Sequence, residues 1–393
     1  MIRTLLSAGS VFDVVSGETL QADVVVAGDR IVEVGCCLDG DQAVNCNGLL
    51  IVPGFIDCHT HVALTGVLGA ARTHRLPRSA RALSAVPVLR ALLGLGVTTI
   101  RDASGADIGL RMALEQGWIQ GPQMLLSLRQ LCTTGGIGDR WSPELGSIAD
   151  QDPVLPDPVF DGPDAARAAV RRMVRAGADW IKVTATGSLV QGDRAFDVQL
   201  TEAEMFALVD EAVRQGDRGV MVHAHNADAA ELAARAGARS IEHAIWLDER
   251  AVAAMAESST WLVPTLSVTQ ADPEAGPAGA AEAHRRSVAL AIAAGVPIAM
   301  GTDSPVRPHS EALREIEYLS DAGLGPIGAF RAATLEAAKL LRLADDRGEI
   351  APGKRADLVL FSGTSLNPVD LEQRIAGVWH NGNPISASTN PRR

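Results

Sequence analysis

The strongest constraint on the fold is a repeated alternation of short apolar segments and alanine-rich segments through the middle of the 393-residue chain. The apolar segments are typical of strands and the alanine-rich segments of helices, so the alternation predicts a parallel sheet covered by helices. Several predicted helices end in a glycine, as at Leu95-Gly96 and Ala236-Gly237, and glycine is the residue expected just past a helix. The pattern predicts strands at 50–58, 97–102, 123–127, 179–184, 219–223, 240–243, 261–266 and 297–303.

Eight strand–helix units favour one architecture, a (β/α)8 TIM-like barrel, with a doubly wound open sheet as the alternative. Both ends of the chain are rich in strand-forming residues. Residues 23–35 form two β-branched runs around a Gly-Asp turn, and the C-terminal segments 356–361 and 378–382 have a similar composition. We therefore expect an α/β protein with a small β-sandwich domain built from both chain termini. The expected boundaries are 1–54 and 350–393 for this domain and 55–349 for the barrel.

The charge and composition exclude several classes of function. The formal net charge is −12 and no run is rich in Lys and Arg, which argues against nucleic acid or an anionic membrane as the main partner. No segment approaches the roughly 20 consecutive apolar residues that span a bilayer, and the N-terminus is typical of a first strand rather than a signal peptide. The 5 cysteines include no Cys-Xaa-Xaa-Cys pair, so we expect a reducing, cytoplasmic compartment. We also expect a homo-oligomer.

A candidate metal site begins at His59 and His61, which follow the apolar run at 50–58. Residues two apart in a strand point to the same face, so the two imidazoles are expected to lie side by side. Imidazole is a common ligand of zinc and related metals. The alternative is a pair of partly exposed loop histidines. Cys58 is expected to point away from this face and to pack in the core.

Other polar residues also fall at or near the ends of predicted strands. Individually each has a structural explanation, such as a hydrogen-bonded histidine or a lysine whose stem packs on apolar surface. Active sites of barrels lie at the C-terminal ends of the strands, so these residues together with His59 and His61 predict one shared site. They are Lys182, His223, His243 and Asp303.

Two long segments interrupt the alternation, at 133–160 and 184–201. Loops that follow strands lie on the catalytic face of a barrel, so both are expected to cover the substrate. The alternative is that they are disordered insertions.

The chain resembles the amidohydrolase superfamily of metal-dependent hydrolases from end to end. Three segments are similar to motifs of that superfamily: Pro53 to His61 to its opening motif, 301–304 (Gly-Thr-Asp-Ser) to its strand-8 motif, and 351–358 to the segment that returns to the small β-domain. Within the superfamily, three further segments are most similar to the Xaa-Pro dipeptidase, carboxypeptidase and ochratoxinase-like, imidazolonepropionase-related group. These segments are 134–139, 180–187 and 240–243.

The resemblance implies a binuclear site with two divalent metal ions. In such a site His59, His61 and Asp303 hold the more buried ion, and His223 and His243 hold the more exposed one. Lys182 is expected to be carboxylated to a carbamate that bridges both ions, because an ammonium group cannot coordinate a cation. Zinc is the expected metal, since nitrogen-rich sites suit it.

The resemblance also implies hydrolysis of an amide or peptide-like bond in a dipeptide or N-acyl amino acid. The expected mechanism is attack by a metal-bridging hydroxide, with Asp303 transferring the proton to the leaving nitrogen. His225, two residues after His223, is expected to hydrogen-bond the scissile carbonyl, and the alternative is a structural histidine that supports the ligands. One departure is Ile137, where relatives often carry histidine, so substrate specificity does not transfer directly.

Three further residues are candidate substrate contacts: Arg140, Arg307 and His309. His74 and His284 are expected at the surface. The rival functions are a lactonase, carbamate hydrolase or deaminase on the same scaffold, although ring deaminases of this type typically lack the strand-4 lysine. A metal-free assembly module is a rival of another class, but such relatives have usually lost ligands.

Overall fold

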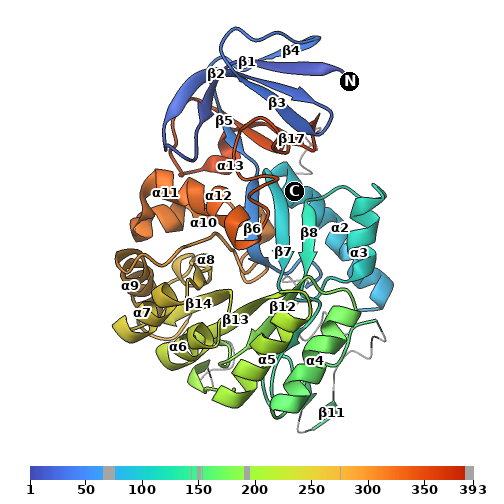
Figure 1. Cartoon of the computed structure of the whole chain (residues 1–393), viewed down its shortest axis with the longest axis vertical. Coiled ribbons are helices and arrows are strands. Elements are labelled where there is room, and N and C mark those ends of the chain that lie inside the picture. Colours follow the sequence, from blue (N-terminus) through green and yellow to red (C-terminus); the bar gives the residue numbers. More distant parts are fainter. Residues whose placement is uncertain are drawn as a thin grey trace.

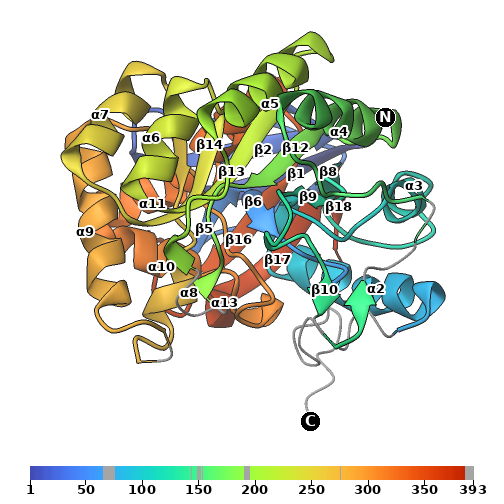
Figure 2. The same ribbon diagram turned by 90° about the horizontal axis from the view of Figure 1, so that it is seen from below.

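The computed structural model describes residues 1–64, 76–142, 144–147, 152, 154–189, 195–274 and 276–385. Figure 1 shows a sheet built from the first and last segments of the chain at one end, and a larger body of strands and helices at the other. Figure 2 looks along this body and shows its strands near the centre with helices around them.

The sheet at the end of the molecule combines strands from both ends of the sequence. Its strands follow the order β18-β17-β16-β5-β1-β2-β3, with β4 paired to β1. The central pairing of β5 with β16 is antiparallel, so the segment before residue 54 and the segment after residue 350 share one hydrogen-bonded sheet. The bounds are β1 (Arg3–Phe12), β2 (Thr19–Ala27), β3 (Arg30–Gly35), β4 (Gln42–Asn45), β5 (Leu49–Pro53), β16 (Leu358–Ser362), β17 (Ile375–His380) and β18 (Asn383–Pro384).

The larger body contains two parallel sheets. One has the order β6-β7-β8 and the other the order β15-β14-β13-β12-β9. The bounds are β6 (Phe55–Thr60), β7 (Val97–Asp102), β8 (Gln123–Leu126), β9 (Gln130–Leu131), β12 (Trp180–Thr184), β13 (Gly219–Asn226), β14 (Ser240–Trp246) and β15 (Trp261–Val263). A strand was also predicted at 297–303. These residues form isolated bridges instead, pairing Ile298 with Leu262 and Ser304 with Thr60.

Backbone hydrogen bonds connect the two parallel sheets at both of their edges. At one edge Asp179 N donates to Leu126 O at 2.8 Å, directly before β12. At the other edge, Ala299 N donates to Leu262 O at 3.0 Å, and Cys58 N donates to Met300 O at 2.9 Å. The segment around 297–304 therefore lies between β15 and β6.

Helices between the strands cover this body (Figure 2). Asp107, Asn226 and Asp248 cap the helices that follow them by accepting backbone N–H bonds, and Thr201 forms a capping box with Glu204. The glycines predicted past helix ends, including Gly96 and Gly237, have positive φ, which explains why glycine is favoured there. The bounds are α2 (Arg78–Gly94), α3 (Ile108–Glu115), α4 (Pro163–Arg175), α5 (Glu202–Arg214), α6 (Ala227–Arg235), α7 (Glu249–Glu257), α8 (Ser267–Gln270), α9 (Ala280–Ala293), α10 (Arg314–Leu319), α11 (Gly325–Ala332), α12 (Leu335–Leu340) and α13 (Leu371–Arg374).

Four phenylalanines join the terminal sheet to the helices and parallel strands. The ring of Phe330 on α11 lies 6.0 Å from those of Phe12 on β1 and Phe55 on β6, and Phe55 lies 6.1 Å from Phe361 on β16. These rings are fully buried, and tilted or edge-to-face contacts of this kind stabilise beyond the area they bury. The terminal sheet is therefore packed onto the end of β6 that is opposite to His59.

The burial of Cys58 and of His284 tests two predictions made from the sequence. Cys58 is fully buried in an apolar cluster, as predicted. His284, predicted at the surface, is fully buried, so that prediction is wrong. Its Nε2–H donates to the carbonyl of His243 at 2.9 Å, because α9 packs against β14. His74 lies outside the described residues. Among the helices that the structure describes, none has the length and apolar character needed to cross a membrane.

Candidate metal centre

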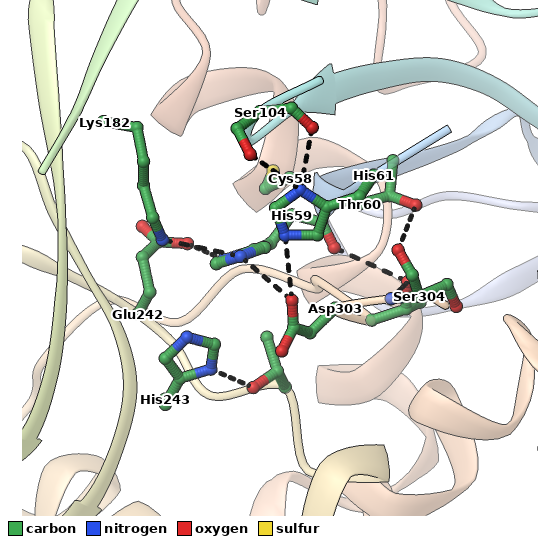
Figure 3. Close-up of polar contacts among 12 residues, drawn as sticks. Cys58, His59, Thr60, His61, Ser104, Lys182, Glu242, His243, Asp303 and Ser304 are labelled. Carbon is green, nitrogen blue, oxygen red and sulfur yellow. Dashed lines mark hydrogen bonds and ion pairs between the residues drawn. The ribbon is translucent and has the colours of Figure 1, made fainter. Parts of the chain in front are cut away.

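Six residues predicted to bind metal lie at the C-terminal ends of strands or in the segment that links β15 to β6. His59 and His61 are at and just past the end of β6, Lys182 is in β12, and His223 and His243 are in β13 and β14. Asp303 follows the bridge at Ile298. All five basic residues are buried. Figure 3 shows the side chains of His59, His61, Lys182, His243 and Asp303 gathered in one interior site.

Asp303 lies at the middle of the site. Its Oδ1 is 3.1 Å from His61 Nε2 and 3.3 Å from His59 Nε2, and its side chain is 15% exposed. Ligand atoms of His59, His243 and Asp303 all lie within 4.8 Å of one another. Nitrogen and carboxylate oxygen in such a group are a donor set that suits zinc and related divalent metals.

The side chain of Lys182 reaches the site from β12. Its Nζ lies 3.5 Å from His59 Nε2 (Figure 3), and the residue is 2% exposed. Burial lowers the pKa of this ammonium to about 8, although the charges of Glu242 and Asp303 act in the other direction. A lower pKa increases the fraction of free amine, which is the form that reacts with CO2 to give a carbamate.

Hydrogen bonds through Nδ1 orient the rings of His59 and His61. His59 Nδ1–H donates to Glu242 Oε2 at 2.6 Å, and His61 Nδ1–H donates to the Ser104 carbonyl at 3.0 Å. Their Nε2 atoms both face the Asp303 carboxylate. At this position a protonated ring donates to Asp303, and a neutral ring offers a lone pair to a cation. The residues thus fit a divalent ion.

His223 is anchored through its other nitrogen. His223 Nε2–H donates to the carbonyl of Gly187 at 2.9 Å, which leaves Nδ1 as the lone pair. Its ring centroid lies 4.6 Å from that of His243. His243 Nδ1 lies 2.7 Å from Thr265 Oγ1. A hydrogen bond at one ring nitrogen fixes the direction of the ring, and so directs the other nitrogen toward a metal ion.

His225 lies beside these two rings. Its centroid is 4.4 Å from that of His223 and 5.3 Å from that of His243. Burial, together with the charge of His223, lowers its pKa well below the usual value. Its buried Nδ1 has no hydrogen-bond partner among the described residues, so a neutral imidazole can use this atom for a bound molecule.

The backbone at two of the predicted ligands is unusual. His243 has φ 71° and Asp303 has φ 53°, which is the left-handed region that residues other than glycine adopt rarely. Ala244, next to His243, has φ 53°. Regular strand geometry would place Glu242 and His243 on opposite faces of β14, and the left-handed turn brings both into the site.

A buried ion pair contacts the side of the His59 ring that points away from Asp303. Arg101 on β7 and Glu242 on β14 are fully buried, and Arg101 Nη2 donates to Glu242 Oε1 at 3.1 Å. Burial opposes ionisation of Glu242, but the charge of Arg101 and the bond from His59 hold its pKa at about 2. Arg101 also lies over the ring of Trp180, 4.5 Å from its centroid. Glu242 is therefore an ionised acceptor for His59.

The Asp303 carboxyl is also held in its ionised form. Burial alone raises its pKa, but the hydrogen bonds and charges of His59 and His61 lower the pKa well below its usual value. Burial lowers the pKa of His61, but the hydrogen bond and the charge of Asp303 act in the other direction. The net result is a pKa above the usual value for histidine. Asp303 is thus available as an anionic ligand or a proton acceptor.

The three predicted substrate contacts occupy different places. His309 is 9% exposed and close enough to His61 for the charge of that ring to help burial lower its pKa to about 4. Arg307 lies 3.6 Å from Glu311. Arg140 lines a pocket with Arg81 and Arg129. In the two loops predicted to cover the substrate, residues 143, 148–151, 153 and 190–194 lie outside the described residues.

Sequence reasoning missed Glu242 and Arg101 as supporting residues. A signal was present, because each is a charge within a buried strand, and such charges are retained when they are paired. Ser104 and Thr265 had no comparable signal. They contact His61 and His243 only because loops far apart in the sequence meet at this end of the strands.

Comparisons with known proteins agree on the kind of molecule. The sequence pattern of the amidohydrolase family matches residues 50–388. The chain is 29% identical over 360 residues to ochratoxinase from Aspergillus niger, covering 84% of this chain and 74% of that protein. A crystal structure of a prolidase complexed with N-methylphosphonate-L-proline is 32% identical, with a TM-score of 0.86, and the match covers 98% of this chain and 99% of that one. A Xaa-Pro dipeptidase with bound methionine is 28% identical, with a TM-score of 0.87 and the same coverage.

Proposed function

The chain belongs to the amidohydrolase family, and on that premise we propose that it is a binuclear metal-dependent hydrolase of amide or peptide-like bonds. The resemblance to dipeptidases and ochratoxinase that the sequence predicted is confirmed by the relatives described above. The proposed substrates are dipeptides or N-acyl amino acids. The observation that carries the proposal is the convergence of His59 Nε2, His61 Nε2 and Asp303 Oδ1 on one point.

We propose the ligand set that the family resemblance implies. His59, His61 and Asp303 would hold one ion, and His223 and His243 would hold the second. Lys182, as a carbamate, would bridge the two from its position 3.5 Å from His59. When bound, divalent ions such as zinc would polarise a carbonyl group and lower the pKa of water, so that a nucleophile is available at neutral pH.

Asp303 has the proposed role of proton carrier. It is ionised, buried on most of its surface and placed between the histidines. We infer that it accepts a proton from the attacking water and delivers it to the leaving nitrogen. Hydrolysis of an amide needs this delivery because an amine anion is a poor leaving group.

His225 has the proposed role of a hydrogen-bond donor to the scissile carbonyl oxygen. Its Nδ1 has no partner among the described residues, and the adjacent ring of His223 is already anchored to Gly187. A donor aimed at the oxygen that becomes negative stabilises the transition state more than the substrate.

We also propose the overall architecture that the sequence predicts. The eight predicted units would form a closed (β/α)8 barrel, because the segment around 297–304 hydrogen-bonds to both β15 and β6. The terminal sheet would form the β-sandwich around its own apolar cluster, which includes Leu6, Ile31 and Leu358. The boundaries 1–54, 55–349 and 350–393, the homo-oligomer and the cytoplasmic location remain predictions.

The function is tested by metal content and by hydrolysis of a substrate library. We expect about two divalent ions per chain by elemental analysis, and release of amino acids from Xaa-Pro, Xaa-Arg or N-acyl amino acid libraries by mass spectrometry. Removing metal with a chelator should abolish hydrolysis, and zinc should restore it. Hydrolysis of lactones or carbamates, or ring deamination, without any amide cleavage would favour the alternative functions on this scaffold. A fully active metal-free protein would contradict the proposal.

A further inference from the structure

We propose that helix α9 positions His243 for metal binding through two buried side chains, His284 and Ser287, which hold the irregular end of β14 in place. The inference rests on the proposed function in one respect, because it takes His243 as a ligand of the second ion. It assigns a role to residues that are neither proposed ligands nor proposed substrate contacts.

The end of β14 departs from the register of the neighbouring strand β13. Ala224 pairs with His243, but Asn226 pairs with Trp246, so β14 contains one extra residue between these pairs. An extra residue of this kind is a β-bulge, which redirects a side chain. Within the bulge, His243 has φ 71° and Ala244 has φ 53°. Two left-handed residues in succession persist only where the surrounding structure holds them.

Two side chains of α9, which packs against β14, supply this support. The Nε2–H of His284 donates to the carbonyl of His243 at 2.9 Å. This carbonyl belongs to the peptide that joins the two left-handed residues, so the bond fixes the rotation of that peptide unit. The hydroxyl of Ser287 donates to the carbonyl of Ile245 at 2.8 Å and accepts the N–H of Leu247 at 2.8 Å. Three backbone groups of the irregular segment are thus satisfied by one helix.

His284 and Ser287 are suited to act together. They are three residues apart in α9 and therefore lie on the same face of the helix. Both are buried, where a polar side chain is costly unless it is hydrogen-bonded. The second nitrogen of His284 is also used, since its Nδ1 lies 2.8 Å from Oγ1 of Thr269 on α8. The ring of His284 is thus held between α8 and the carbonyl of His243.

The short helix α8 provides the other half of the support. Thr265, two residues before this helix, lies 2.7 Å from His243 Nδ1 through its Oγ1. Glu315 on α10 is fully buried and accepts the two backbone N–H groups at the start of α8 at 2.7 Å each. No bond inside a helix can satisfy such N–H groups. The ring of His243 is therefore held through α8, and its backbone is held through α9.

The direction of the His243 ring depends on this support. Its centroid lies 4.9 Å from that of His59 and 4.6 Å from that of His223. If the peptide after His243 were free to rotate, the segment could relax to the extended conformation, and the ring would turn away from these two histidines. Because His284 and Ser287 act through the backbone of a proposed ligand, their loss should affect metal binding rather than the chemical step.

The experiment uses the full-length protein with and without zinc. His284→Leu removes the donor but fills most of the space, Ser287→Ala removes the hydroxyl, and His284→Gln keeps an N–H donor at the end of the side chain. Arg286→Gln, exposed on the same helix, is the control. Circular dichroism and thermal unfolding verify the fold of each variant.

Zinc affinity is measured by competition with a chromophoric chelator. We expect His284→Leu to weaken binding of the second ion by roughly 10- to 100-fold, the usual cost of losing the support of a metal-binding histidine, with the first ion bound normally. Ser287→Ala should show a smaller loss, and His284→Gln and Arg286→Gln should bind zinc almost as the wild type does. On any substrate that is hydrolysed, kcat at saturating zinc should approach the wild-type value in each variant.

A merely structural role of α9 would lower the melting temperature but leave both zinc dissociation constants unchanged, and that result would overturn the inference. If His284→Leu does not fold, Ser287→Ala is decisive, and unchanged zinc affinity in this variant would overturn the inference as well.

The conformation of the metal-free protein separates the two proposals. Crystal structures of the metal-free wild type and His284→Leu would show whether residues 243 and 244 leave the left-handed region in the variant. An unchanged backbone at these residues would overturn the inference and leave the proposed function intact. If the wild type binds no zinc but the backbone of the variant rearranges, the proposed function fails, and the role of α9 in shaping β14 is supported.

Discussion

Glu242 Oε2 lies 2.6 Å from Nδ1 of His59, and both side chains are buried away from solvent. The carboxylate accepts the ring N–H, and in turn receives two bonds from the guanidinium of Arg101. This arrangement fixes His59 as the tautomer whose Nε2 faces Asp303. A proposed metal ligand on β6 is therefore oriented by an ion pair between β7 and β14.

The first prediction concerns this orientation. Glu242→Gln should weaken metal binding by roughly 10- to 100-fold, the usual cost of losing a partner of a metal-binding histidine. The measurement is the metal dissociation constant by competition with a chromophoric chelator, with circular dichroism to verify folding. Glu257→Gln, at the exposed end of α7, is the control and should bind metal normally. Unchanged metal affinity in Glu242→Gln would show that His59 is oriented by other contacts.

Lys182→Ala should lose most of the bound metal and activity, because the proposed anionic bridge is removed. A short carboxylic acid or high bicarbonate should restore part of the activity by supplying an oxygen bridge. Lys339→Ala, at a surface ion pair with Glu336, is the matched lysine control. Elemental analysis and kcat are the measurements. Full metal content with normal turnover in Lys182→Ala would exclude the carbamate.

Asp303→Asn keeps the volume of the side chain but cannot carry the proton. We expect metal to be largely retained and kcat to fall by at least ~10²-fold, the lower end of general acid–base contributions. The variant is measured on the best substrate of the library at matched metal content. A fall of only a few-fold would assign the proton transfer to another residue.

His223→Ala and His225→Ala should differ although the two rings are neighbours. His223→Ala should lose metal and activity together, because a proposed ligand is removed. His225→Ala should keep its metal while kcat falls by roughly 10²–10³-fold, the loss expected for one transition-state donor. Metal per chain and kcat distinguish the two. The opposite pattern would exchange their roles, and no effect in either would place the reaction elsewhere.

The last prediction concerns stability near the C-terminal strands. Asp346 accepts bonds from Arg30 at 2.6 Å, Arg347 at 2.7 Å and Arg355 at 3.0 Å. Burial raises its pKa, but these bonds lower it far more, well below the usual value. A carboxyl whose pKa is lowered by folding stabilises the protein above its unfolded pKa of about 4, and the stabilisation is lost as the pH falls further.

Asp346→Asn should therefore be less stable than the wild type at about pH 7, and the difference should shrink as the pH falls below about 4. Urea unfolding at several pH values is the measurement. Asp345→Asn changes the exposed neighbouring carboxylate and should match the wild type at each pH. A stability difference that does not vary with pH would show that the ionisation of Asp346 has no part in it.

Much of the scaffold was predictable because periodic features are local. The strand segments around His59, Lys182, His223 and His243 were predicted from apolar runs. Their glycine-ended helices were found because a helix end imposes φ requirements on single residues. The segment at 297–303 was harder to predict, since isolated bridges leave the same apolar sequence pattern as a regular strand.

Some features of the candidate site were likewise predictable from the sequence, and others were not. The sequence by itself determined which residues stand at strand ends, because the apolar runs that form the strands are local features. It also determined which of these residues share a face, because side chains alternate along a strand. Only the tertiary structure decided that Glu242 and His243 both face the site, since the left-handed turn at His243 breaks the alternation of β14. The pocket of Arg81, Arg129 and Arg140 likewise required the tertiary structure. Contacts between segments far apart in the chain depend on how the strands and helices pack, and the sequence pattern does not contain that information.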